Sequence, residues 1–465
     1  MAERDDSWIE EEFRWADLGD ERLNWRLKKI IADLAAQPMA SLPQASEDLA
    51  ALKATYRFFD NKSIKAPDLL LSHQAATLAR VREHAVILAV QDTTFLDFTA
   101  HPQTQALGPL ATEHNRGLCS HNTLAFTPER LPLGLLQQQV WVRDEDTYGK
   151  QEPHKTRKIQ DKESQKWLTS LEALNKIAPL CKETKLISVG DAEADIFDFF
   201  HQKREANVEF LVRACQDRCV EGGGRLRSRL QASAEVAQLV VNLQRRGKEA
   251  PRTAHLRVRY ENVKLLPPQA RNREGLEPVS VGVILVHEDY PPAGCKAVDW
   301  LLITTLSLGS VVQALECVDW YCVRWQIEIW HKVLKSGCRF EGLQLGHADR
   351  LERCLALYSV IAWRLLYAVM LSRTAPHLSC ELLLDPWEWK ALYCHVYKRS
   401  LAPSATPDLK TAVAWIGRLG GYLGRNGDGP PGATVLWRGL QRLGDITEMY
   451  RIMSSPSPPT FVGKA

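Results

Sequence analysis

Several hallmarks of other protein classes are missing from this sequence. Its eleven cysteines contain no CxxC pair, and the closest spacing, Cys215 to Cys219, departs from that of a zinc ribbon. We therefore expect reduced thiols, as is usual inside cells. The segment from Met1 to Phe13 is acidic and lacks the basic region and apolar stretch of a signal peptide. The most apolar long segment, Cys354 to Leu371, contains Arg364, which favours a buried helix over a membrane span. These absences predict a soluble, cytoplasmic protein.

An excess of charge of one sign is also missing from the chain as a whole. Lys and Arg number 59 against 56 Asp and Glu, a net charge of +3, so composition alone does not demand a polyanionic partner. Basic residues do gather locally, because residues 241–275 hold nine Lys or Arg against three Asp or Glu. This patch suits phosphate contacts, although a solvated hairpin face has the same composition. Its predicted DNA contacts are Arg245, Arg246, Lys248 and Arg252.

The length and texture of the chain predict three regions. At 465 residues the chain is too long to fold around a single hydrophobic core of ordinary size. Helical spacing in the first region, residues 1–72, gives candidate helix starts at Asp20, Ser46 and Pro67. Strand-like runs that alternate with helices predict an α/β domain with a mixed sheet over residues 73–375, interrupted by a β-rich insertion at about 216–299. A helical region follows over residues 376–465, ending in a Pro/Ser-rich tail from Ser454 that we expect to be mobile.

Two aspartates follow apolar runs of strand length. Ala85 to Val90 leads into Asp92, and Lys185 to Val189 leads into Asp191. Side chains at such positions project into the crevice at the carboxyl ends of a sheet, where paired carboxylates can hold a hard cation through oxygen. Acids after strands are also ordinary turn and cap residues, so each aspartate alone is weak evidence.

A helix predicted from near Ser310 through Lys335 supplies a third set of polar residues. Tyr321, Arg324, Glu328 and Lys335 stand at offsets of 0, 3, 7 and 14, which places them on one stripe of a helix. An exposed Arg324–Glu328 pair would contribute only about 0.3–0.5 kcal/mol. It would also leave the apolar flanking residues unexplained, so the stripe predicts a buried, functional face. These flanking residues are Trp325, Ile327, Ile329 and Trp330.

These motifs together resemble those of bacterial insertion-sequence DDE transposases. The helix resembles the Y-x2-R-x3-E-x6-K (YREK) signature of the insertion-sequence-four group, which includes transposon-five transposase. Asp191-Ala-Glu193-Ala-Asp195 matches the family's second acidic motif, and Gln91-Asp92-Thr93-Thr94 matches the first. Further similarity spans nearly the whole chain. Ala192 departs from the family pattern, in which Arg often follows the second aspartate, and this puts an auxiliary contact in doubt.

The resemblance implies a ribonuclease-H-like core, an N-terminal domain that binds the transposon end, and a C-terminal region that pairs two protomers. It implies that Asp92, Asp191 and Glu328 bind two Mg²⁺ or Mn²⁺ ions. Further residues would contact DNA: Tyr321, Arg324, Lys332 and Lys335 near the cleaved end, together with Trp325 and Arg213. Trp300 would take up a flipped base, or it is an ordinary core tryptophan. On the N-terminal helices, Arg22, Arg26, Tyr56 and Arg57 either contact DNA or line a solvated face.

The implied activity is cut-and-paste transposition in the bacterial cytoplasm, at the nucleoid. A homodimer would cut double-stranded transposon ends through a hairpin intermediate and join their 3′ ends to target DNA. Two alternatives remain at this point: a catalytically inactive, transposase-derived DNA-binding protein, and a structure-specific nuclease of the same fold that does not join strands.

Overall fold

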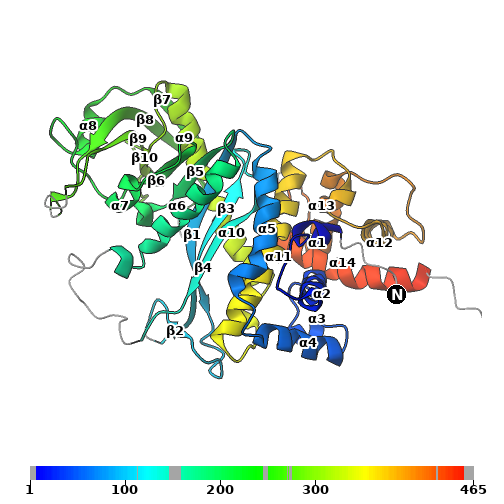
Figure 1. The fold of residues 1–465 in the computed structure, drawn as a ribbon. Coiled ribbons are helices and arrows are strands. Elements are labelled where there is room, and N and C mark those ends of the chain that lie inside the picture. Colours follow the sequence, from blue (N-terminus) through cyan, green and yellow to red (C-terminus); the bar gives the residue numbers. More distant parts are fainter. Residues whose placement is uncertain are drawn as a thin grey trace, which may run out of the picture.

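The computed structural model of the chain describes residues 7–454 apart from residues 113, 146–158, 244–249, 270, 272–274 and 426–427. It confirms an α/β protein with a mixed sheet and helical regions at both ends (Figure 1). All eleven cysteines are free, as the spacing predicts. The expected mobile tail beyond Ser454 lies outside the described residues, as do Arg245, Arg246 and Lys248.

The N-terminal region is helical because its polar residues stand at helix starts. The Asp20 side chain accepts the Arg22 N–H at the first turn of α2, and Asp48 accepts the Ala51 N–H in α4. The expected start at Ser46 is therefore two residues early, whereas Pro67 does stand in the first turn of α5. The bounds are α1 Ser7–Glu12, α2 Glu21–Ala36, α3 Leu42–Ala45, α4 Leu49–Asp60 and α5 Ala66–Val81.

Ten strands form a single sheet in the described part of the chain. Strand β3 pairs in antiparallel orientation with both β4 and β1, and β5 pairs in parallel orientation with both β1 and β6. The sheet continues through β10 into β9, β8 and β7, so the predicted β-rich insertion extends the same sheet. The bounds are β1 Val86–Asp97, β2 Gly108–Pro109, β3 Arg116–Phe126, β4 Pro132–Trp141, β5 Lys185–Gly190, β6 Val208–Arg213, β7 Ala237–Leu243, β8 Arg252–Leu265, β9 Val279–His287 and β10 Asp299–Thr304.

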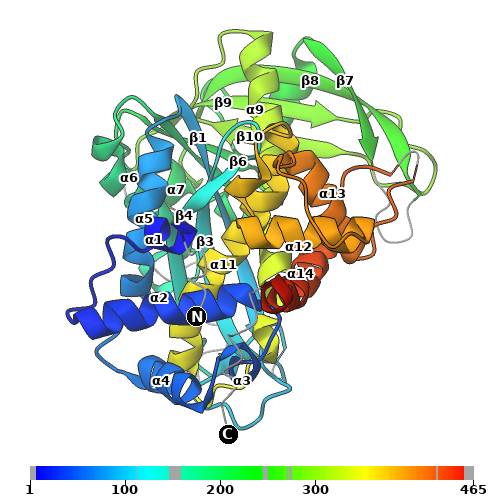
Figure 2. The same cartoon turned by 90° about the vertical axis from the view of Figure 1, so that its right-hand side faces the viewer.

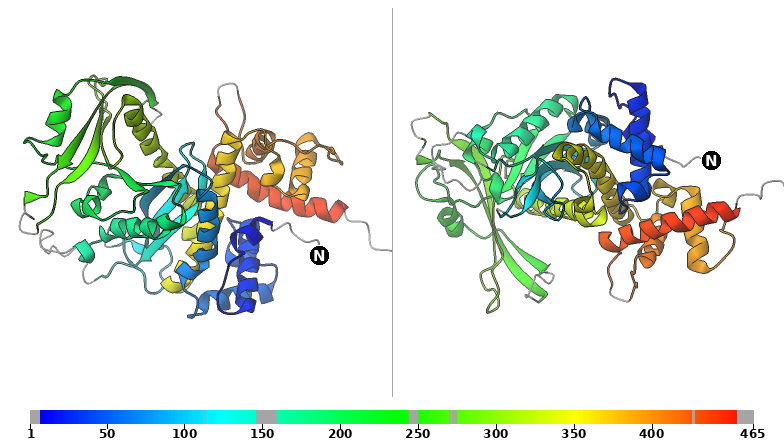
Figure 3. Two further views of the ribbon diagram at one scale, coloured as in Figure 1. Left: turned by 45° about the horizontal axis from the view of Figure 1, so that its top comes forward. Right: turned by 90° about the horizontal axis from the view of Figure 1, so that it is seen from below.

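Helices cover both faces of this sheet (Figure 3), because strand residues of alternate parity point to opposite sides. On one side, buried residues of β1 and β5 share a core cluster with α6 Gln165–Ile177 and α7 Phe197–His201, and α8 Leu226–Ala232 packs on β8 and β9. On the other they pack with α9 Val311–Val323, α10 Trp325–Lys332 and α11 Ala348–Thr374. Helix α11 is long and apolar enough to cross a membrane, but 78% of its most apolar window is buried inside the protein. It is therefore a core helix, as Arg364 within it suggests.

The C-terminal helices pack on α11 and lie beside the N-terminal helices (Figure 2). They are α12 Pro386–Tyr397, α13 Leu409–Leu419 and α14 Ala433–Ser454. Figure 1 shows both helical regions at one end of the molecule and β7, β8 and β9 at the other. The sheet segment that carries the aspartates thus lies between them.

Candidate active site and DNA interface

Asp92 and Asp191 lie side by side in the structure. Val90 of β1 pairs with Val189 of the parallel strand β5, and each aspartate stands two residues further along the chain, Asp92 within β1 and Asp191 directly after β5. The Asp92 position differs from the expectation in one respect, since β1 does not end before it but continues to Asp97 in antiparallel pairing with β3. The apolar run therefore marks only the half of β1 that is buried on both faces.

Each aspartate has one carboxylate oxygen held by a nearby backbone N–H. Asp92 Oδ1 accepts the Thr93 N–H at 2.8 Å, and Asp191 Oδ1 accepts the Glu193 N–H at 2.8 Å as the cap of a 3-10 turn, Ala192–Ala194. Gly190 permits that turn, because a Cβ there would lie 2.7 Å from the Ala194 Cβ. The other carboxylate oxygen of Asp92, Oδ2, faces Arg324 and His331.

The two neighbouring acids are electrostatically strained. Burial and then the charge of Asp191 raise the pKa of Asp92 to about 7, and Glu328 adds to the effect. Burial also raises the pKa of Asp191, whereas Arg324 and Lys166 act in the opposite direction. A divalent cation would relieve this repulsion, and carboxylate oxygens are the ligands that Mg²⁺ and Mn²⁺ prefer. The donor set therefore fits such an ion.

Glu328 reaches this site from α10, but an arginine holds it. Arg324 Nη2 donates to Glu328 Oε1 at 2.8 Å, and Arg324 Nη1 lies 3.9 Å from Asp92 Oδ2. The guanidinium thus stands between the two carboxylates, and the Glu328 side chain is 42% exposed. Within the described ranges, no group of three or more His, Cys, Asp or Glu residues is arranged to hold a metal ion. The convergence of all three acids on a metal stays a prediction.

The expected single stripe on this helix is broken in two places. Helix α9 ends at Val323 and α10 begins at Trp325, and a π-helical turn, Val333–Gly337, follows α10. The π-helical turn contains Lys335, which pairs with Glu341 at 3.4 Å. Lys332 is exposed in the last turn of α10.

The aromatic residues predicted for this region divide into a buried and an exposed group. Tyr321 is buried, which raises its pKa, and its ring packs edge-to-face on Trp300 at 6.0 Å. Trp300 is half-buried within β10, so part of its side chain packs against the core and part is accessible to solvent. Trp325 is 44% exposed with the Arg324 guanidinium over its ring, against the expected burial, while Ile327 and Trp330 are buried. Arg213 donates to the Asp299 carbonyl.

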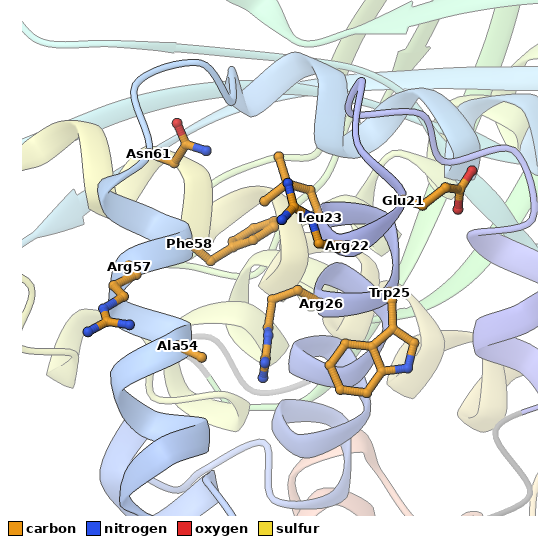
Figure 4. A pocket seen from close by; sticks show the side chains of 9 residues that line it. All are labelled: Glu21, Arg22, Leu23, Trp25, Arg26, Ala54, Arg57, Phe58 and Asn61. Atoms are coloured by element: carbon orange, nitrogen blue, oxygen red, sulfur yellow. The ribbon is translucent and has the colours of Figure 1, made fainter.

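A hollow of about 670 Å³ lies between α2 and α4 in the N-terminal region (Figure 4). Arg22, Arg26 and Arg57 line it with Trp25, which is 61% exposed and lies 4.9 Å from the Arg26 guanidinium. Figure 4 shows the Arg26 side chain between the two helices. Sequence reasoning missed Trp25, although an exposed tryptophan beside arginines is a recognisable signal for nucleic acid. Tyr56 instead packs partly against the core.

Other basic residues are neutralised within the protein. Lys28 pairs with Glu10, and Lys29 pairs with Glu47 and Asp33. In the β-rich insertion, Arg252 donates to the buried Glu288, and Arg257 pairs with Glu235 and Asp289. In the insertion, the acids that pair with Arg252 and Arg257 are distant from them in the sequence. Because Arg252 is already paired, it is disfavoured as a phosphate contact.

Two segments of the chain match known protein families. Residues 5–64, which include α1 to α4, match a family described as transposase DNA-binding. Residues 360–458, from the second half of α11 through α14, match the transposase Tn5 dimerisation domain. Both matches support a Tn5-like transposase. They also support DNA and a second copy of the chain as its partners.

Proposed function

We propose that the protein is a cut-and-paste DNA transposase of the DDE type, in the YREK group, that binds transposon ends and joins them to target DNA. The observation that carries this proposal is the pair formed by Asp92, within β1, and Asp191, directly after the adjacent parallel strand β5, with the pKa of Asp92 raised to about 7. Along the sequence, the pair lies between a segment that matches a transposase DNA-binding family and one that matches a transposase dimerisation domain. The antiparallel strands β4, β3 and β1 beside parallel β5 and β6 support a ribonuclease-H-like core.

Asp92, Asp191 and Glu328 would hold two Mg²⁺ or Mn²⁺ ions, which activate the attacking oxygen and stabilise the leaving one when bound. Glu328 would join the aspartates once a DNA phosphate draws Arg324 away, because a guanidinium binds phosphate oxygens as well as carboxylates. Tyr321 and Lys335 would help to hold that phosphate. Trp300 would stack on a base unpaired at the DNA end, which returns about 1–3 kcal/mol of its unpairing cost.

The proposed reaction exchanges one phosphodiester bond at a time. Water first attacks the phosphorus at the transposon end and releases a 3′ hydroxyl. That hydroxyl attacks the opposite strand to form a hairpin, a second water opens it, and the 3′ end then attacks target DNA. Each attacking oxygen loses a proton and each leaving oxygen gains one. Because water or DNA supplies every attacking oxygen, no covalent bond to the protein is needed. Such a sequence requires a homodimer that holds two ends in a synaptic complex.

End cleavage tests this proposal directly. A duplex selected from a random library by binding to the protein is labelled on each strand and incubated with Mg²⁺ and plasmid DNA. We expect nicks, hairpins and strands joined to plasmid, and none of these with EDTA. Fragments that never join would indicate a structure-specific nuclease. Binding without cleavage in Mg²⁺ or Mn²⁺ would contradict catalysis and leave a DNA-binding protein.

The hollow between α2 and α4 predicts where the DNA end is held. Replacing Arg26 or Arg57 by Ala should weaken end binding and reduce the slope of log K against log salt by about one, since each arginine would neutralise one phosphate. Trp25→Ala should weaken binding with an unchanged slope. Fluorescence anisotropy across a salt series measures both quantities. Lys182→Ala removes an exposed charge elsewhere as the control, and an Arg26→Ala slope equal to the control's would rule out this contact.

A further inference from the structure

A line of polar side chains is buried behind Asp92. Asp92 of β1 pairs directly with Asn122 of β3, which in turn pairs directly with Gln138 of β4. All three side chains point to the sheet face covered by α10 and α11, where His331 and Ser359 meet them. Asn122 and Ser359 are fully buried within an otherwise apolar core. Buried polar groups in such a core need hydrogen-bond partners, so the partners along this line indicate which atoms donate and which accept.

The hydrogen bonds along this line have a defined direction. Gln138 Nε2 donates to Ser359 Oγ at 2.8 Å and to Asn122 Oδ1 at 2.9 Å, and Ser120 Oγ donates to the same Oδ1 at 3.1 Å. The Asn122 carbonyl is therefore used as an acceptor, and its amide nitrogen faces His331 Nε2 at 3.4 Å. An amide nitrogen can only donate, so Nε2 accepts and the imidazole proton is on Nδ1.

That Nδ1–H faces the unused oxygen of Asp92. His331 Nδ1 lies 3.9 Å from Asp92 Oδ2, while Oδ1 is held by the Thr93 N–H. Arg324 lies at the same distance from Oδ2, but it is bonded to Glu328 and would move with the DNA. His331 is buried and tethered at its other nitrogen. It therefore presents an N–H toward Oδ2 from a fixed position, at a separation longer than a hydrogen bond.

We propose that His331 is a positioning residue that orients the Asp92 carboxylate for its divalent cation, and that Asn122 sets the tautomer in which it does so. The inference rests on the proposed function, because it needs Asp92 to be a metal ligand. Donors behind a ligating carboxylate fix its orientation, and their loss typically costs about 10–100-fold in metal affinity.

Mn²⁺ binding to the full-length protein, measured by electron paramagnetic resonance, tests the proposal without relying on activity. His331→Leu removes the donor and should raise the Mn²⁺ dissociation constant about tenfold or more. His331→Asn places an amide N–H near the former Nδ1 and should restore most of the affinity. In cleavage assays, His331→Leu should raise the half-saturating Mn²⁺ concentration more than it lowers the maximal rate.

Two further variants separate positioning from packing. Thr123→Val removes a buried hydroxyl from the same strand on the opposite sheet face, where Thr123 bonds to Ser170, and should leave Mn²⁺ affinity unchanged. Asn122→Leu keeps His331 but frees its tautomer, so it should weaken Mn²⁺ binding and keeps the test decisive if His331→Leu does not fold. Wild-type affinity in His331→Leu and Asn122→Leu would overturn the positioning role alone. A wild-type protein whose Mn²⁺ binding is absent, or is unaffected by Asp92→Asn, would overturn the proposed function and the positioning role with it.

Discussion

Asp92→Asn is expected to reduce Mg²⁺-dependent cleavage of end DNA by at least about 10³-fold, the scale on which an essential catalytic group acts. The amide has no negative charge to hold a cation, although it has nearly the same shape as the acid. DNA binding should be unaffected, because the N-terminal hollow is built from other elements. Strand cleavage on a denaturing gel and binding by anisotropy measure the two effects separately. Wild-type cleavage by Asp92→Asn would contradict the DDE mechanism.

The same substitution should stabilise the metal-free protein. The pKa of Asp92 is raised from 3.8 to about 7 by burial and by Asp191, so the folded state binds the proton more tightly than the unfolded state does. The resulting penalty is absent below about pH 3.8, grows as the pH rises, and is complete above about pH 7. It is on the order of a few kcal/mol. Asn carries no charge, so the stability gain of Asp92→Asn should be larger at pH 8 than at pH 5.

Urea unfolding in EDTA at both pH values measures this gain. Asp445→Asn, an exposed substitution of the same kind on α14, serves as the control and should change little. Adding Mg²⁺ should raise the stability of the wild type and not that of Asp92→Asn. A gain that does not vary with pH would show that Asp92 ionises normally in the folded protein.

The second large effect concerns Glu12, at the end of α1. Its carboxylate bonds to His73 Nδ1 at 2.6 Å and to Arg80 Nη1 at 2.6 Å, and the Arg80 guanidinium lies over Trp363 of α11. Glu12→Ala leaves a mostly buried arginine without its main carboxylate. We expect a loss of about 3–5 kcal/mol in the free energy of unfolding. Glu11→Ala is the matched control, since the Glu11 side chain is 65% exposed and 4.0 Å from Arg80. It should cost less than about 1 kcal/mol.

Acid should weaken this cluster in the wild type. Burial lowers the pKa of His73, and hydrogen bonds from His73 and Arg80 lower the pKa of Glu12 despite its burial. Both groups therefore contribute stability above their ordinary values of 6.5 and 4.5 that is lost as the pH falls below them. The difference in urea midpoint between the wild type and Glu12→Ala should persist down to pH 4.5 and shrink as the pH falls below it, because the Glu12 carboxylate is then protonated. Equal losses for Glu12→Ala and Glu11→Ala would contradict the cluster's importance.

Local patterns predicted much of the fold. The sequence indicated the helix starts near Asp20 and Pro67, and it indicated the long core helix. It also indicated the apolar runs before Asp92 and Asp191. Each depends on neighbours a few residues away, and backbone hydrogen bonding and side-chain alternation act over that range. The continuation of β1 beyond Asp92 was not visible, because its partner strand β3 is distant in the sequence.

Charge in the candidate site was harder to predict from the sequence. Arg324 and Glu328 were visible as a pair on one stripe, but not that the guanidinium also faces Asp92. The basic run of residues 241–275 suggested a phosphate-binding patch, but Glu288, directly after the neighbouring strand β9, neutralises Arg252. The sequence did not indicate the π-helical turn around Lys335 or its pairing with Glu341.

The sequence by itself determined which residues form helices and strands and which acids, arginines and aromatics are available for chemistry, because those properties depend on side chains and near neighbours. Only the tertiary structure decided that Asp92 lies beside Asp191, that Arg324 separates Asp92 from Glu328, and that His331 Nδ1 faces Asp92 Oδ2. Desolvation and Coulomb interactions depend on distances through space, and these groups come from segments that are 99 to 239 residues apart in the sequence.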